Sequence, residues 1–160
     1  MNKALKPTGP YHDFWVLNKN DYPYDQYAEF EGRKDAPVRI EDDIILYIYD
    51  SLKWITPYSE TKIDSNGLNL YGDTILESTG SKQLENVAQA WVQLWNNAPN
   101  DFVITGGYQF ISDENGNAID DGEYQQILIN KQKILQTFNK LIEICRIASD
   151  ENYYILHLGI

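Results

Sequence analysis

The side chains with the widest chemical range in this chain are two histidines, His12 and His157, and a single cysteine, Cys145. A histidine that acts as a general base needs a positioned partner, and 145 sequence positions separate these two. His157 lies in the strand-like stretch 153–158, where we expect a hydrogen-bonded structural histidine. Cys145 falls on the apolar face of a helical pattern, so we expect a small buried side chain there. This set predicts no hydrolase centre, no internal disulfide and no zinc site.

The acidic loop 113–123 is the segment that comes nearest to a calcium-binding pattern. Oxygen-bearing side chains at alternate positions from Asp113 match the first three ligand positions of an EF-hand loop. Ala118, however, stands where that loop requires glycine, and Tyr124 stands where it requires a bidentate glutamate. We therefore predict no metal ion and no cofactor. Two interpretations of the loop remain: a solvated hairpin connection, or an acidic projection that contacts a partner.

Two pairs of adjacent carboxylates, Asp42/Asp43 and Asp120/Asp121, could be considered for acid and base chemistry. Neighbouring side chains point to opposite faces of a strand and about 100° apart on a helix, so neither pair resembles the acid and nucleophile of a glycosidase. The glycines 106–107 follow a strand pattern but open no helix, which predicts a bulge or a close backbone contact instead of a phosphate-binding loop. We expect no catalytic residue and a protein that is not an enzyme.

Aromatic residues are abundant, with twelve tyrosines and four tryptophans. Tyr22, Tyr24 and Tyr27 alternate with carboxylates near the N-terminus. Rings provide desolvated contact area and cation–π attraction, and carboxylates form paired hydrogen bonds with arginine, so the combination suits basic partners. The same tyrosines could equally form a structural edge of a sheet.

The formal net charge of the 160 residues is −11, and residues 41–120 carry ten of the excess negative charges. This sign disfavours direct binding to nucleic acid, because affinity for phosphates depends on lysine and arginine. An acidic surface attracts basic partners and speeds their association. The alternative interpretation is that the charge serves solubility alone.

The N-terminal segment has no apolar run of signal-peptide length, and the longest apolar run, residues 44–49, is far shorter than the roughly 18 to 20 residues of a membrane span. We therefore expect a soluble, cytoplasmic protein that does not bind membranes.

The hydrophobic pattern predicts strands, helices and turns in one α+β domain over residues 1–160. Residues 1–40 are expected to be irregular and rich in loops, with a strand-like stretch at 11–17. Further along the chain we expect a helix at 41–55, a strand at 68–77 with an irregularity at Gly72, a helix at 82–97 capped by Ser81, strands at 102–111 and 123–129, a helix from Asn130 to Ala148, and a strand at 153–158. The second helix is expected to bury Leu84, Val87, Ala88, Trp91, Leu94 and Trp95. The predicted architecture is an antiparallel or mixed sheet with about three helices packed on it.

Four segments, 67–75 (GLNLYGDTI), 91–99 (WVQLWNNAP), 105–108 (TGGY) and 154–160 (YILHLGI), together resemble small bacterial immunity proteins of polymorphic-toxin and contact-dependent inhibition systems. The resemblance implies a cytosolic antidote that binds a cognate toxin domain, often a nuclease with a basic active surface, and blocks it by occlusion. Such families share no catalytic residues that could be transferred to this chain.

The expected function is therefore that of a non-enzymatic immunity protein whose partner is a toxin with a basic surface. Two alternatives remain: an acidic mimic of nucleic acid that inhibits an enzyme, and a small-ligand protein or enzyme with a pocket near His157. The residues expected to contact the partner are Tyr22, Tyr24, Tyr27, Asp42, Asp43, Asp73, Asp113, Glu114, Asp120, Asp121 and Glu123.

Overall fold

The structure is a computed structural model that describes residues 4, 6, 9–58, 66–110, 112–117 and 122–160. In chain order its elements are β1 (Tyr11–Asn18), the 3₁₀ helix η1 (Tyr24–Phe30), β2 (Val38–Glu41), α1 (Asp42–Leu52), β3 (Asp73–Leu76), α2 (Ser78–Asn96), β4 (Asp101–Gln109), β5 (Glu123–Asn130), α3 (Lys131–Ile147) and β6 (Tyr153–Leu158). The predicted α+β class is confirmed.

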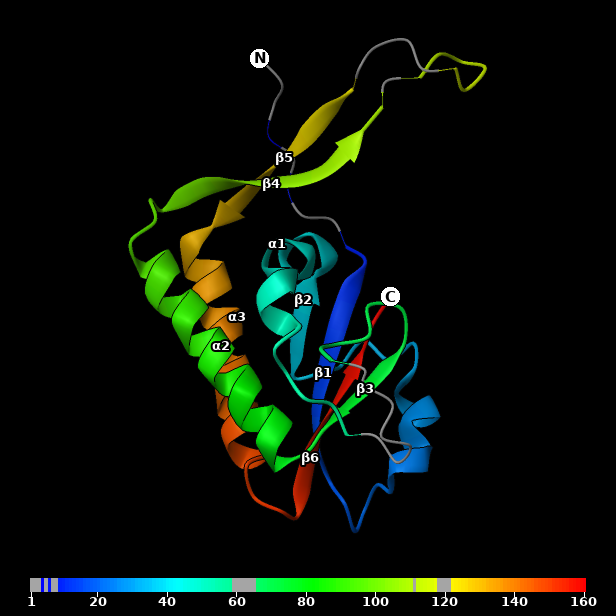
Figure 1. Ribbon diagram of the computed structural model, residues 1–160, viewed down its shortest axis with the longest axis vertical. Coiled ribbons are helices and arrows are strands. Elements are labelled where there is room, and N and C mark those ends of the chain that lie inside the picture. Colours follow the sequence, from blue (N-terminus) through cyan, green and yellow to red (C-terminus); the bar gives the residue numbers. More distant parts are fainter. Residues whose placement is uncertain (1–3, 5, 7–8, 59–65, 111, 118–121) are drawn as a thin grey trace.

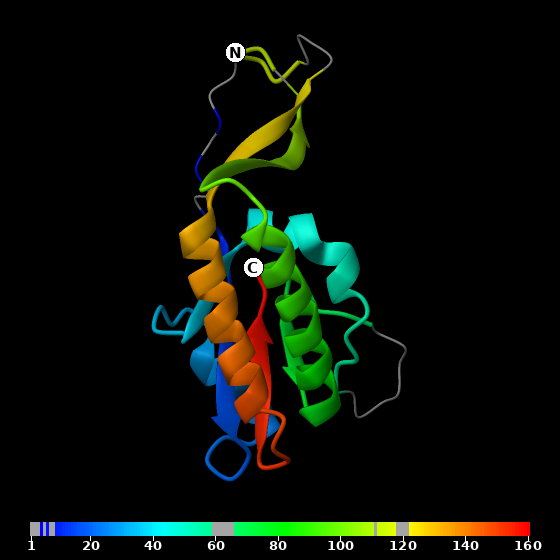
Figure 2. The same ribbon diagram turned by 90° about the vertical axis from the view of Figure 1, so that its left-hand side faces the viewer.

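The main sheet has four strands in the order β2-β1-β6-β3, and every neighbouring pair is antiparallel. The first and last strands of the chain lie next to each other at its centre, with Phe14 opposite His157 and Trp15 opposite Leu156. Helices α2 and α3 lie side by side over one face of this sheet (Figures 1 and 2). Because β6 lies between β1 and β3, the sheet is complete only when this C-terminal strand is in place.

Side chains of the central strands alternate between two apolar clusters, as strand geometry requires. In β1, Phe14 belongs to the larger cluster, which the three α-helices cover, whereas Trp15 and Leu17 belong to a smaller cluster beneath η1. In β6, Ile155 joins the larger cluster and Leu156 the smaller one. Both faces of the sheet are thus covered, which explains why these strands are almost continuously apolar.

The predicted helices are present, but the second one differs in detail. α2 begins at Ser78, so the predicted cap at Ser81 is wrong: this residue is buried inside the first turn and its hydroxyl donates to the Leu76 carbonyl. Leu94, predicted to face the core, is 58% exposed, whereas Trp95 is buried as expected. On the buried face of α2, the Trp95 ring packs edge-on against Phe138 of α3, with 4.7 Å between the ring centroids.

The N-terminal forty residues are more regular than the sequence indicates. β1 is a central strand of the sheet, and β2 is an edge strand that the sequence analysis did not predict. The strand predicted at 68–77 is shorter, because only Asp73–Leu76 pairs with β6. The segment before it instead turns around Gly67, whose φ of 85° lies in the left-handed region that favours glycine.

Strands β4 and β5 form a separate two-stranded sheet, the arm, which projects away from the main body (Figures 1 and 2). At its root Ile104, Ile127 and Ile129 are buried in the larger core cluster. The arm is therefore anchored at one end only. Within the described residues, none of the helices combines the length and apolar composition needed to cross a bilayer.

The start of α3 gives a direct test of the fold. The Asn130 side chain accepts a hydrogen bond from the Lys133 amide at 3.0 Å, which is the predicted cap. We expect Asn130→Ala to lower the free energy of unfolding by about 1 kcal/mol in urea denaturation, whereas Asn139→Ala at an exposed position in the same helix should change it by less than about 0.5 kcal/mol. Equal effects of the two substitutions would contradict the capping assignment.

Candidate functional site

The arm is the first candidate site, and its shape follows from its glycines. Its two strands pair regularly from Asp101 opposite Asn130 to Thr105 opposite Gln126, and the register then shifts at glycines 106–107. The predicted bulge is confirmed. A Cβ at Gly106 would lie 3.0 Å from the Ile127 side chain, so a larger residue at this position would press against Ile127. β-Bulges increase local twist, which turns the outer half of the arm relative to its root.

The outer half of the arm carries an exposed aromatic cluster. Tyr108 pairs with Tyr124 across the two strands, with ring centroids 5.0 Å apart, and Phe110 packs edge-on against Tyr108 at 5.2 Å. Tyr108 is 44% exposed, Tyr124 59% and Phe110 67%. These rings touch each other instead of the core, so a large apolar surface stays in contact with water.

The arm and the loop that joins its strands carry acidic residues but no basic ones. Residues 101–130 contain six acidic residues and no lysine or arginine. Glu114 and Glu123 are exposed, while Asp120 and Asp121 lie outside the described residues. Five of these six acidic residues fall in the segment 113–123, so the segment next to the exposed rings is rich in carboxylates.

The carboxylate of Asp113 has a structural role in the loop at the end of the arm. It accepts hydrogen bonds from the amides of Asn115 and Asn117 at 2.9 and 2.8 Å, and these bonds lower its pKa, with Asn117 the largest contributor. Such an Asx turn explains the alternating Asp and Asn pattern that the sequence shares with an EF-hand. No group of three or more His, Cys, Asp or Glu side chains suitable for a metal ion occurs among the described residues.

The second candidate site is a buried network that joins the two histidines. His12 Nδ1 lies 2.9 Å from His157 Nε2, and His12 Nε2 lies 2.9 Å from Asp42 Oδ1. The planes of the two rings are within 10° of parallel with their centroids 5.1 Å apart, as expected for rings joined edge to edge by a hydrogen bond, and neither has any exposed surface. On the far side, His157 Nδ1 makes a longer contact of 3.4 Å with the Thr74 hydroxyl. The network links β1, β6, β3 and the start of α1.

One set of proton positions satisfies this network. A carboxylate can only accept, so His12 donates from Nε2 to Asp42 and, as a neutral ring, accepts at Nδ1 from His157. His157 then accepts at Nδ1 from the Thr74 hydroxyl, which in turn accepts from the Asn69 amide at 2.8 Å. Every member has a partner with both rings uncharged. Burial lowers the pKa of His12 although Asp42 opposes the shift, and burial together with His12 lowers the pKa of His157 well below its ordinary value.

The buried position of the histidines limits what they can do chemically. Neither histidine lines the cavity beneath the arm or the cavity beside β3, although Thr74, which contacts His157, is in the wall of the second one. His157 is buried and hydrogen-bonded, as expected. Cys145 is also fully buried, and burial raises the pKa of its thiol, so it behaves as the small apolar side chain that was predicted.

The predicted contact residues Asp42 and Asp43 lie at the start of α1, where the flanking Glu41 and Ile44 share a cavity with Ile129 at the root of the arm. The Asp42 carboxylate contacts His12, and only 18% of its side chain is exposed. Asp43 is half-buried, and burial raises its pKa, with smaller contributions from Asp42 and Glu41. Asp73 is exposed at the start of β3, across β6 from Asp13.

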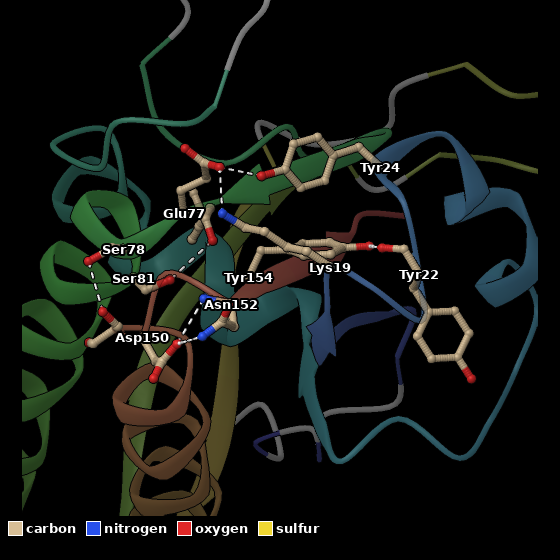
Figure 3. A network of polar contacts seen from close by, with 11 residues as sticks. Lys19, Tyr22, Tyr24, Glu77, Ser78, Ser81, Asp150, Asn152 and Tyr154 are labelled. Carbon is tan, nitrogen blue, oxygen red and sulfur yellow. Dashed lines mark hydrogen bonds and ion pairs between the residues drawn. The ribbon is translucent and has the colours of Figure 1, made fainter.

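Tyr22, Tyr24 and Tyr27 pack under the opposite face of the sheet, in the smaller apolar cluster. Tyr24 donates to Glu77, which also pairs with Lys19 at 2.9 Å, and these two hydrogen bonds lower the pKa of Glu77 (Figure 3). The Tyr154 hydroxyl donates to the Tyr22 carbonyl at 3.1 Å, also drawn in Figure 3. These intramolecular contacts favour the structural interpretation of this segment over an interface.

Two features of the candidate sites were not predicted from the sequence. The histidines come together only because β1 and β6 pair, and that long-range pairing leaves no local pattern around either residue. The exposure of Tyr108, Phe110 and Tyr124 was also missed, although the absence of lysine and arginine between residues 83 and 130 could have singled out the segment.

A comparison with family models, curated proteins and solved structures returns no significant match. The resemblance to immunity proteins therefore stays a prediction, carried by the four sequence segments alone.

The histidine network predicts a specific pH dependence of stability. Because the pKa of each ring is lower in the native state than in the unfolded chain, the native state binds fewer protons around and below the ordinary histidine pKa, and acidification must destabilise it. We expect the free energy of unfolding to fall by about 2 kcal/mol between roughly pH 7.5 and pH 5.5 in urea titrations.

The matched control is the double variant His12→Gln/His157→Gln, which removes every histidine in the chain. Its stability should change much less over the same interval, whatever its absolute value. An unchanged slope in the double variant would show that other groups cause the pH dependence.

Proposed function

We propose that this protein is a non-enzymatic antidote that uses the β4–β5 arm to bind the basic face of a toxin domain and block it, acting in the cytoplasm. The observation that carries the proposal is the arm itself. It projects from the body, exposes three adjoining aromatic rings, and carries six acidic residues with no lysine or arginine.

The chemistry of the arm suits a partner rich in arginine and lysine. Tyr108, Phe110 and Tyr124 offer ring faces and edges that gain free energy when a partner covers them, and aromatic side chains are the usual anchors of protein interfaces. Carboxylates such as Glu114 can pair with guanidinium groups, and a guanidinium also stacks on an aromatic ring. Nucleic-acid-cleaving toxins need basic surfaces for their own substrate, so their active face is complementary to this arm.

The shape of the arm suggests how inhibition would work. A two-stranded projection can enter a cleft on the partner, and the body behind it then covers the surrounding surface. Inhibition by occlusion requires no catalytic group in the antidote. Negative charge concentrated in the segment 113–123 would orient the two proteins before contact and speed their association.

The direct test is co-expression with the toxin encoded next to this gene. The wild-type protein should form a complex and restore growth, whereas the double variant Phe110→Ala/Tyr124→Ala should weaken binding at least about tenfold, because the exposed rings are the proposed anchors. Both rings lie outside the core, so circular dichroism and the unfolding midpoint should stay close to wild type.

The matched control is Tyr71→Ala, which removes a ring that is 77% exposed but lies outside the arm. It should leave the affinity unchanged. Absence of a complex and of growth rescue by the wild-type protein would refute the proposed function. A complex that Tyr71→Ala weakens and the arm variant does not would place the interface elsewhere.

Charge on the arm should affect the association rate. We expect Glu114→Lys to slow association with the toxin several-fold at low salt, and the difference from wild type should shrink as salt rises, because long-range attraction is screened. Glu143→Lys makes the same charge change at an exposed position on α3 and serves as the control. Identical rates for the two variants would show that only net charge matters, not its place on the arm.

A further inference from the structure

A cavity of about 360 Å³ lies at the root of the arm, between β2, α1, β5 and α3. Its walls are mainly apolar and include Ile40, Ile44, Ile129, Ile134 and Phe138. The volume is at the lower end of the range for small-ligand pockets, roughly 300 to 1,000 Å³, and such pockets typically combine apolar walls with a few polar groups that orient the ligand. This cavity is separate from the aromatic cluster on the outer half of the arm.

The polar group that distinguishes the cavity is a buried carboxylate. Glu41 lines it and is only 5% exposed. It stands just before α1 but makes no capping hydrogen bond to the helix, and its partner is the Lys133 ammonium at 2.6 Å. The Lys133 side chain is 69% exposed, so the negative member of the pair lies inside and the positive member lies at the mouth.

The other charges around the cavity reinforce this polarity. Asp101 lines the cavity on the side of β4 and Lys6 lines it at an exposed position, while Asp42 and Asp43 follow Glu41 directly in the chain. The interior end is thus negative and apolar. Lysine at the mouth can move into water at little cost, because its ammonium is already largely hydrated.

We propose that this cavity binds an ammonium or guanidinium group carried on a short aliphatic chain. The chain packs against the isoleucine and phenylalanine walls, and the cationic head takes the place of the Lys133 ammonium beside Glu41. An anionic ligand with the same chain could pair with Lys133 only by drawing it away from Glu41, which would leave a buried carboxylate unpaired, a costly arrangement. The same chemistry occurs in free alkylamines and in lysine or arginine side chains of a protein.

The test uses the isolated protein with three probes of the same chain length. In ¹H–¹³C methyl NMR titrations, n-pentylammonium should shift the isoleucine methyls of the cavity and bind at least about tenfold more tightly than n-pentanol, because its charged hydrogen bond to Glu41 has no counterpart in the alcohol. Pentanoate should bind most weakly. Nα-acetyl-lysine methylamide separates the two sources, since its binding shows that a protein side chain can reach the site.

Substitutions at the pair identify the group responsible. Glu41→Gln keeps the shape of the side chain but removes its charge, and should abolish the preference for n-pentylammonium over n-pentanol. Glu85→Gln alters another ion-paired carboxylate, on α2, and should leave the preference intact. Lys133→Met removes the competing ammonium and should tighten the binding of n-pentylammonium about tenfold.

Pentanoate binding as tightly as n-pentylammonium, or no methyl shifts with the amine at millimolar concentration, would overturn the proposal. So would a Lys133→Met variant that stays folded and binds the amine more weakly. Because no toxin is involved, these outcomes are independent of the proposed function of the arm.

Discussion

The hydrogen-bonded pair of buried histidines is the interaction on which the rest of the structure depends. His12 and His157 lie on the two central strands of the sheet, one near the start of the first strand and one near the end of the last, and they are hydrogen-bonded to each other. A polar group left unpaired at such a depth costs about 1–3 kcal/mol, so the two strands must pair in one register, and Asp42 must stand where α1 begins. The pair therefore fixes the first strand, the last strand and the first helix relative to one another.

The arm lies outside the body formed by the main sheet and its helices. The larger core cluster is formed mainly by the main sheet and its three α-helices, and the isoleucines at the root of β4 and β5 join it, with Phe102 packed against it. Beyond the bulge at glycines 106–107 none of the described helices or strands of the body covers the arm, and its rings pack on each other. A chain gains no stability of its own from exposing such a surface, which is why we attribute it to binding.

Local patterns predicted most of the fold, because they reflect local physics. The α3 helix was predicted with its cap at Asn130, since an asparagine before a regular apolar stripe is a local signal. The edge strand β2 was not predicted. It is only four residues long and depends on non-local pairing with β1, so residues 38–41 have no local pattern that indicates a strand. The contact residues could not be predicted in this way. An acidic residue in the sequence indicates charge but not its partner, and Asp42 is hydrogen-bonded to His12, thirty positions earlier in the chain.

The histidine network holds the two central strands together, and we propose that the arm contacts the partner. Hydrogen–deuterium exchange of the protein, free and bound to its toxin, tests this division most directly. We predict that complex formation slows exchange in β4 and β5 and leaves β1, β6 and the tyrosine segment around η1 unchanged. Slower exchange confined to the tyrosine segment or to β3, with the arm unaffected, would contradict the account.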